Sequence, residues 1–118
     1  MNRTYIEQDP IMDTQTVISL NTDGAKVVLS RIESTSNEVD VKYSYTGSKV
    51  IFHRLVKTIT SLYERGNYDR AGLYEQALED LLAVQFSDTE LEQLSADYKV
   101  NNLIDLVSAL LKEGAFNT

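Results

Sequence analysis

The chain holds its only histidine and its clearest basic cluster within one stretch, residues 46–66. Lys49, His53 and Lys57 recur at every fourth position, and Arg54 directly follows the histidine. Residues at this spacing lie along one line of a helix. These four side chains, the basic patch, could bind phosphate groups or an acidic partner.

The charge of the neighbouring segments favours a different role for the basic patch. Residues 48–65 have a net charge of +3, whereas residues 1–47 have −3 and residues 66–118 have −7. Acidic flanks oppose a polyanion, and runs of charge are usually solvated faces. We therefore expect no nucleic-acid site. We expect the patch to pair with carboxylates of the later helices, such as Glu75, Glu79 and Asp80, or to lie in water.

Other residues that could support chemistry form no recognised pattern. With no cysteine and one histidine, the chain lacks the usual ligand sets of a zinc site. The stretch "TGSK", residues 46–49, ends like a phosphate-binding loop but lacks the first glycine of GxxxxGK[ST]. Carboxylates at helix starts are explained by the helix dipole. We predict no catalytic residue, no metal and no cofactor, and hence a protein that is not an enzyme.

Length and composition are typical of one globular domain. The 118 residues are 42% hydrophobic and 25% charged, a balance that allows a core without disulfides or metal. No apolar run approaches the ~20 residues that cross a bilayer, and the first residues show no signal-peptide pattern. We expect a soluble, cytoplasmic protein that forms a single domain over residues 1–118 and binds no membrane.

The first part of the chain predicts an antiparallel sheet of about three strands, mainly within residues 16–46. Residues 1–15 show no sustained periodicity and contain Pro10, so we expect a loose arm or an edge segment there. Two β-branched runs flank Asp23-Gly24, which is typical of a hairpin. The last predicted strand alternates apolar with polar residues; its apolar positions are Val39, Val41, Tyr43 and Tyr45.

The second part, residues 48–113, predicts about four helices packed on one face of that sheet, an α+β fold. The first spans roughly Ser48 to Arg65, and the second about Arg70 to Val84. A third should begin after Ser87, because Ser87 and Glu90 fit a capping box. The fourth should run from Asn101 or Asn102 to Glu113. Gly66 and Gly114 are expected to end the first and last helices.

The last predicted helix is apolar around much of its circumference. Its apolar set is Leu103, Ile104, Leu106, Val107, Ala109, Leu110 and Leu111. This set is too wide for a helix that meets a core along one stripe. The helix must be central to the helical half or must present a docking surface to another chain. The predicted protein-binding residues are Tyr98, Leu103, Leu106, Leu110 and Leu111.

These patterns favour a small, acidic, non-enzymatic protein-binding module of the adaptor, assembly-chaperone or inhibitor type. It would bind a protein partner, or a second copy as a homodimer, through its last helix. The alternative is an acidic inhibitor that imitates nucleic acid, which the charge of residues 66–118 permits. A third hypothesis is an enzyme with a dispersed active site. In layout the chain is similar to small acidic accessory proteins of phages and other mobile elements, including assembly chaperones of viral tails.

Overall fold

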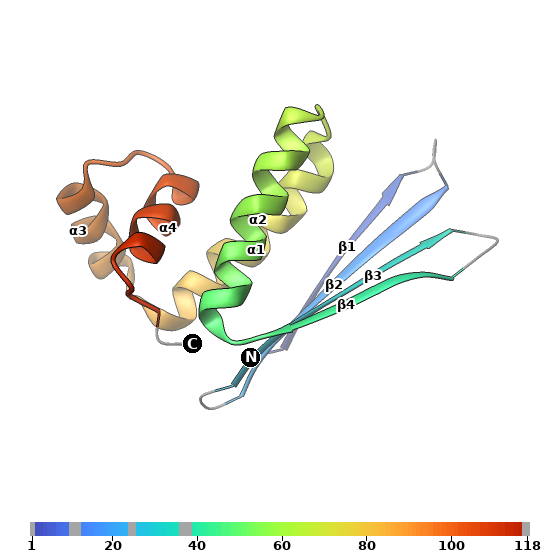
Figure 1. Cartoon of the computed structure of the whole chain (residues 1–118), viewed down its shortest axis with the longest axis horizontal. Helices are drawn as coiled ribbons and strands as arrows, with labels where there is room; N and C mark the ends of the chain where they lie inside the picture. The colour runs from blue at the N-terminus through green and yellow to red at the C-terminus, as the bar shows by residue number, and fades with distance from the viewer. Residues whose placement is uncertain (1, 10–12, 24–25, 36–38, 117–118) are drawn as a thin grey trace.

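The structure is a computed structural model that describes residues 2–9, 13–23, 26–35 and 39–116, with the backbone alone described for some strand residues. The described residues form four strands followed by four helices (Figure 1). In chain order these are β1 (Asn2–Asp9), β2 (Thr14–Asp23), β3 (Lys26–Thr35), β4 (Val39–Thr46), α1 (Ser48–Glu64), α2 (Tyr68–Gln85), α3 (Asp88–Tyr98) and α4 (Leu103–Lys112). The predicted α+β class, with an N-terminal antiparallel sheet before the helices, is confirmed.

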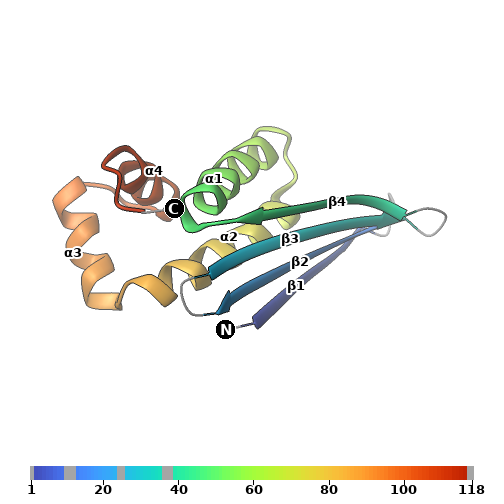
Figure 2. The same ribbon diagram turned by 60° about the horizontal axis from the view of Figure 1, so that its bottom comes forward.

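The sheet is an antiparallel meander in the order β1-β2-β3-β4 (Figure 2). It has four strands where the sequence predicted about three, because β1 forms in the segment expected to be a loose arm or an edge segment. It is an edge strand, paired along its length with β2. The sequence concealed it because Tyr5 and Ile6, two large apolar neighbours, point to opposite faces of the sheet.

The predicted hairpin and last strand are present. β2 and β3 pair from Thr14 opposite Thr35 to Asp23 opposite Lys26. The tight turn expected at Gly24 lies outside the described residues, as do the side chains at the apolar positions of β4. The backbone register does place Tyr45 opposite Leu29. The predicted face of β4 is therefore compatible with the covered side of the sheet.

The helices begin and end close to the predicted residues because their capping signals are used. Ser87 accepts a hydrogen bond from the Glu90 backbone N–H, and the Glu90 carboxylate accepts one from the Ser87 N–H, each at 3.2 Å. This is the predicted capping box. Gly66 and Gly114 follow α1 and α4 with φ angles of 76° and 69°, a left-handed conformation that glycine adopts without strain.

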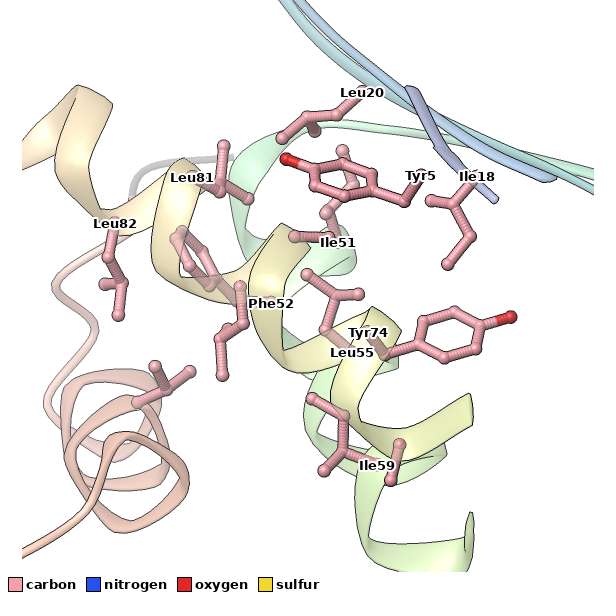
Figure 3. Packing of buried hydrophobic residues seen from close by; sticks show 14 of the residues in the cluster. Tyr5, Ile18, Leu20, Ile51, Phe52, Leu55, Ile59, Tyr74, Leu81 and Leu82 are labelled. Carbon is pink, nitrogen blue, oxygen red and sulfur yellow. The ribbon is translucent and has the colours of Figure 1, made fainter. Parts of the chain in front are cut away.

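The core lies between one face of the sheet and the pair α1 and α2 (Figure 3). The sheet contributes Tyr5, Ile18 and Leu20. The two helices contribute Ile51, Phe52, Leu55, Ile59, Leu62, Ala71, Tyr74, Ala77, Leu78, Leu81 and Leu82. The buried polar side chain within the described part is Thr16, whose hydroxyl oxygen has no hydrogen-bond partner there, an arrangement that costs stability.

The last two helices do not cover the sheet, which corrects the prediction that all four helices pack on one of its faces. α1 and α2 contact the strands, α4 packs against α1, and α3 packs against α4 (Figure 1). Within the described ranges, no helix is both long and apolar enough to cross a membrane. The broad apolar surface of α4 is therefore used to extend the core sideways, away from the strands.

The inward side of α4 is part of that core. Leu106 and Leu110 are 1% and 2% exposed. Leu103, Ile104 and Leu111 are half-buried at its margin. Of the two roles that the sequence allowed, the structure assigns this side of α4 to internal packing.

Two substitutions on α4 test that assignment. Leu106→Ala should lower the free energy of unfolding by about 2 to 5 kcal/mol, because it opens a cavity in the core. Leu111→Ala on the same helix removes the same atoms from a half-buried site and should cost clearly less. Urea denaturation of both variants gives the two values. Equal losses, or a smaller loss for Leu106→Ala, would contradict the packing described here.

Candidate protein-binding site

The basic patch lies on the exposed side of α1. Lys49, His53, Arg54 and Lys57 all have exposed side chains. Two of the carboxylates expected to pair with them have other partners. Glu75 accepts a hydrogen bond from the Tyr63 hydroxyl, and Asp80 accepts hydrogen bonds from β1. The patch is thus a solvated face, one of the two outcomes that the sequence allowed.

The predicted protein-binding residues of the C-terminal region do not form one surface. Leu106 and Leu110 are buried, whereas Tyr98, Leu103 and Leu111 are half-buried. A partner could reach the first two only by displacing α1. Within the part of the chain that the structure describes, none of the large apolar side chains with high exposure lies on α3 or α4.

The described residues bring no catalytic or metal-binding cluster together. Across residues 2–9, 13–23, 26–35 and 39–116, no group of three or more histidine, aspartate or glutamate side chains could hold a metal ion. His53 stands on the outer face of α1, away from the groove described below.

Two polar contacts hold α2 along β1. The Arg70 Nε donates to the Glu7 Oε2 at 3.3 Å, and both side chains are less than one fifth exposed. Further along, the Asp80 carboxylate accepts from the Arg3 guanidinium at 3.2 Å and from the Tyr5 hydroxyl at 2.5 Å. The helix therefore runs antiparallel to the strand, with its first turns beside the end of β1. We call these two contacts the α2 clamp.

The Tyr5 hydroxyl is tuned by this environment. Burial of the side chain raises the pKa of Tyr5 above its ordinary value of 10.0, and the hydrogen bond to the Asp80 carboxylate raises it further. The proton is therefore held where it can be donated to Asp80. Tyr5 also contributes its ring to the core, so one residue links the sheet, the core and α2.

The outer edge of β1 is free of any strand in the described structure, because β1 pairs with β2 alone. Its charged side chains Arg3 and Glu7 point toward α2. The alternating positions that point away are Asn2, Thr4, Ile6 and Gln8, all exposed and uncharged. Natural edge strands are usually protected by outward charges, proline or bulges. These positions of β1 carry no such protection.

Exposed apolar side chains gather around this edge. Ile6 lies opposite Val17, and Val17 opposite Ile32, on the face of the sheet turned away from α1 and α2. Ile6 and Ile32 are 57% and 39% exposed, and Tyr68 at the start of α2 is 65% exposed. The ring of Tyr68 contacts that of Tyr63, with centroids 5.8 Å apart. We call Ile32, Val17, Ile6, Tyr68 and Tyr63 the edge strip.

A groove joins the two halves of the edge strip. It has a volume of about 400 Å³ and lies between the β1 edge and α2. Ile6 and Glu7 form the strand side, while Tyr68, Asp69, Gly72 and Leu73 form the helix side. Of its two carboxylates, Glu7 is held by Arg70, and Asp69 is exposed. The groove is thus an open channel with apolar walls and an acidic rim.

Comparison with known proteins does not extend this description. No family model, no curated protein and no solved structure matches the chain. The case for a function therefore depends on the residues themselves.

Sequence patterns missed the edge strip almost entirely. Ile6 lies in a segment without periodicity, and Tyr68 precedes the predicted start of the second helix. Gly72 stood out only as a residue that weakens a helix. The weak signal was the excess of seven tyrosines over no tryptophan, since tyrosine is enriched at interfaces. It did not single out Tyr63 or Tyr68.

Tyr5→Phe tests the α2 clamp through its pH dependence. Loss of the hydrogen bond to Asp80 should lower the free energy of unfolding by about 1 to 2 kcal/mol near pH 7. Because the pKa of Tyr5 is raised in the folded state, its contribution is complete below about pH 10 and is lost as the pH rises further. The gap between the wild type and the variant should therefore narrow above pH 10. Urea titrations from pH 7 to pH 11 measure it.

Tyr68→Phe is the matched control for this experiment, because Tyr68 is exposed and lies at the other end of the clamp. It should leave stability nearly unchanged throughout. A gap between wild type and Tyr5→Phe that stays constant to pH 11 would refute the role assigned to the Tyr5 hydroxyl.

Proposed function

We propose that this protein is a small non-enzymatic protein-binding module whose binding surface is the edge strip. A single observation carries the proposal: exposed apolar side chains from β1, β3, α1 and α2 gather around an unpaired strand edge. Scattered exposed apolar residues are normal in monomers, but a contiguous group is typical of interaction sites. A cytoplasmic location and a protein partner are parts of the same proposal.

The edge strip is better suited to this role than the last helix. Tyr68 is 65% exposed and carries a polar hydroxyl on an apolar ring, the combination that interfaces favour. The apolar side chains of α4 are instead buried or half-buried within the chain. A partner at the edge strip gains apolar contact without disrupting the core.

The proposal assigns no catalytic role to the groove. Its side chains include Glu7, Tyr68 and Asp69, but Glu7 is neutralised by Arg70 and lies against α2. General acid and base chemistry needs two titratable groups with environments that separate their pKa values. The geometry supports binding, in which apolar walls supply contact and the acidic rim supplies selectivity.

A second candidate is an acidic inhibitor that imitates nucleic acid. It is favoured by exposed carboxylates on α3 and α4, namely Asp88, Glu90, Glu92, Asp97 and Asp105. A basic cleft would be its target. The two candidates differ in their response to salt, because apolar contacts are little affected by screening. If the edge strip is the surface, partner binding should fall by less than about tenfold between 50 and 200 mM salt. A steeper fall supports the mimic.

The proposal is tested by removing the apolar side chains of the edge strip without changing charge. The double variant Ile6→Ser, Tyr68→Ser should recover at least about tenfold less partner than the wild type when each is used as bait in extract from the native host. A loss of this size corresponds to about 1.4 kcal/mol of binding free energy. Mass spectrometry quantifies the recovered protein, and circular dichroism confirms that the variant is folded.

The matched control is Val50→Ser, Val84→Ser, which removes two aliphatic side chains that are 45% and 49% exposed. These residues lie outside the edge strip, at the start of α1 and the end of α2. The control should retain the partner. If both double variants recover it as well as the wild type does, the edge strip is not the binding surface. Sedimentation equilibrium separates a second copy from a different protein as the partner.

A further inference from the structure

Gly72 is a residue that the fold itself does not require. It lies inside α2, where glycine costs about 1 kcal/mol relative to alanine. Its backbone is not in the left-handed region, and a Cβ added there would meet no heavy atom within 4 Å. Neither the backbone conformation nor the packing within the described chain explains a glycine at this position.

The position of Gly72 supplies a reason. It forms part of the helix wall of the groove, across from Ile6 and Glu7 of β1. A glycine in such a wall lets another backbone or side chain approach the helix closely. The missing side chain therefore widens the groove at the point where a bound segment would pass between the strand and the helix.

The other wall of the groove is a strand edge with unpaired backbone groups. β1 has eight residues and lacks a neighbour on this side (Figure 2). An extended segment can add to such an edge as another strand, at a spacing of about 4.8 Å from β1. Backbone hydrogen bonds then supply affinity, and alternate side chains of the segment contact the walls.

Charge selects among the segments that could bind. The chain has a net charge of −7, so a second copy would be repelled and a cationic partner attracted. At the groove itself, the Asp69 carboxylate is exposed, whereas that of Glu7 is bound by Arg70. A lysine or arginine of the partner can meet Asp69, and apolar side chains can contact Tyr68, Leu73 and Ile6.

We propose that the groove binds an extended segment of another protein, with alternating apolar and basic residues, that adds to β1 as a fifth strand beside Gly72. This inference rests on the proposed function, because it names the kind of partner that the edge strip would recognise. The fit of the groove to this partner comes from three separate features: a free strand edge, a helix wall without a side chain and an acidic rim.

The probe is a blocked octapeptide of alternating lysine and valine, added to the full-length chain labelled with ¹⁵N. Amide chemical shifts should change along residues 2–9 and 68–76 and change little elsewhere. Gly72→Gln fills the groove and should weaken binding at least about tenfold. Because glutamine is a good helix former and Gly72 has no close neighbours, this variant should remain folded.

Ala83→Gln is the matched control, a change of similar size at an exposed position further along α2. It should bind the peptide as the wild type does. Two control peptides test the mode of binding. A peptide with every amide methylated lacks the donors for strand pairing, and one with glutamate in place of lysine lacks the charge match. Both should bind at least about tenfold more weakly.

Four results would overturn the inference: no binding at millimolar peptide, shift changes away from β1 and α2, equal binding of either control peptide, or binding that Gly72→Gln leaves intact. Dimerisation that Gly72→Gln abolishes would likewise assign the groove to a second copy. The proposed function fails separately. If Gly72→Gln still captures the native partner while Ile6→Ser, Tyr68→Ser does not, the edge strip binds a protein but not as an added strand.

Discussion

The arrangement of this protein depends on how α2 is held against the edge strand β1. Two polar contacts, Arg70 with Glu7 and Asp80 with Arg3 and Tyr5, join residues more than 60 positions apart in the chain. Exposed ion pairs contribute little to stability, but Glu7 and Arg70 are largely covered, and Tyr5 also contributes its ring to the core. The contacts therefore serve mainly to set the position of the helix relative to the strand.

That position has a direct consequence for the surface. By drawing Arg3 and Glu7 toward α2, the clamp removes the charges that would otherwise protect the edge of β1. The residues left on the outer side are uncharged, and the first turns of α2 lie beside the strand with Gly72 and Tyr68 next to Ile6. The same interaction that completes the fold also creates the groove and the edge strip.

The second half of the molecule shows how an apolar surface can mislead. α4 has a broad apolar circumference because α1 covers one side of it and α3 packs against it away from the sheet. A helix at the margin of a small core, shielded by one neighbour on each side, has the same residue pattern as a helix that binds another chain. The distinction depends on what lies next to it, which a periodic pattern does not contain.

Local signals in the sequence determined the elements that depend on neighbouring residues: the helix starts at Ser87 and Asn102, the glycine stops after α1 and α4, and the alternating strand β4. Each is a contact between residues a few positions apart, so the pattern contains both partners. β1, the edge strip and the groove were decided only by the tertiary structure. Tyr5 needs Asp80, and Ile6 gains its meaning from Tyr68 and Gly72. Those partners lie more than 60 residues away, and only folding brings them together.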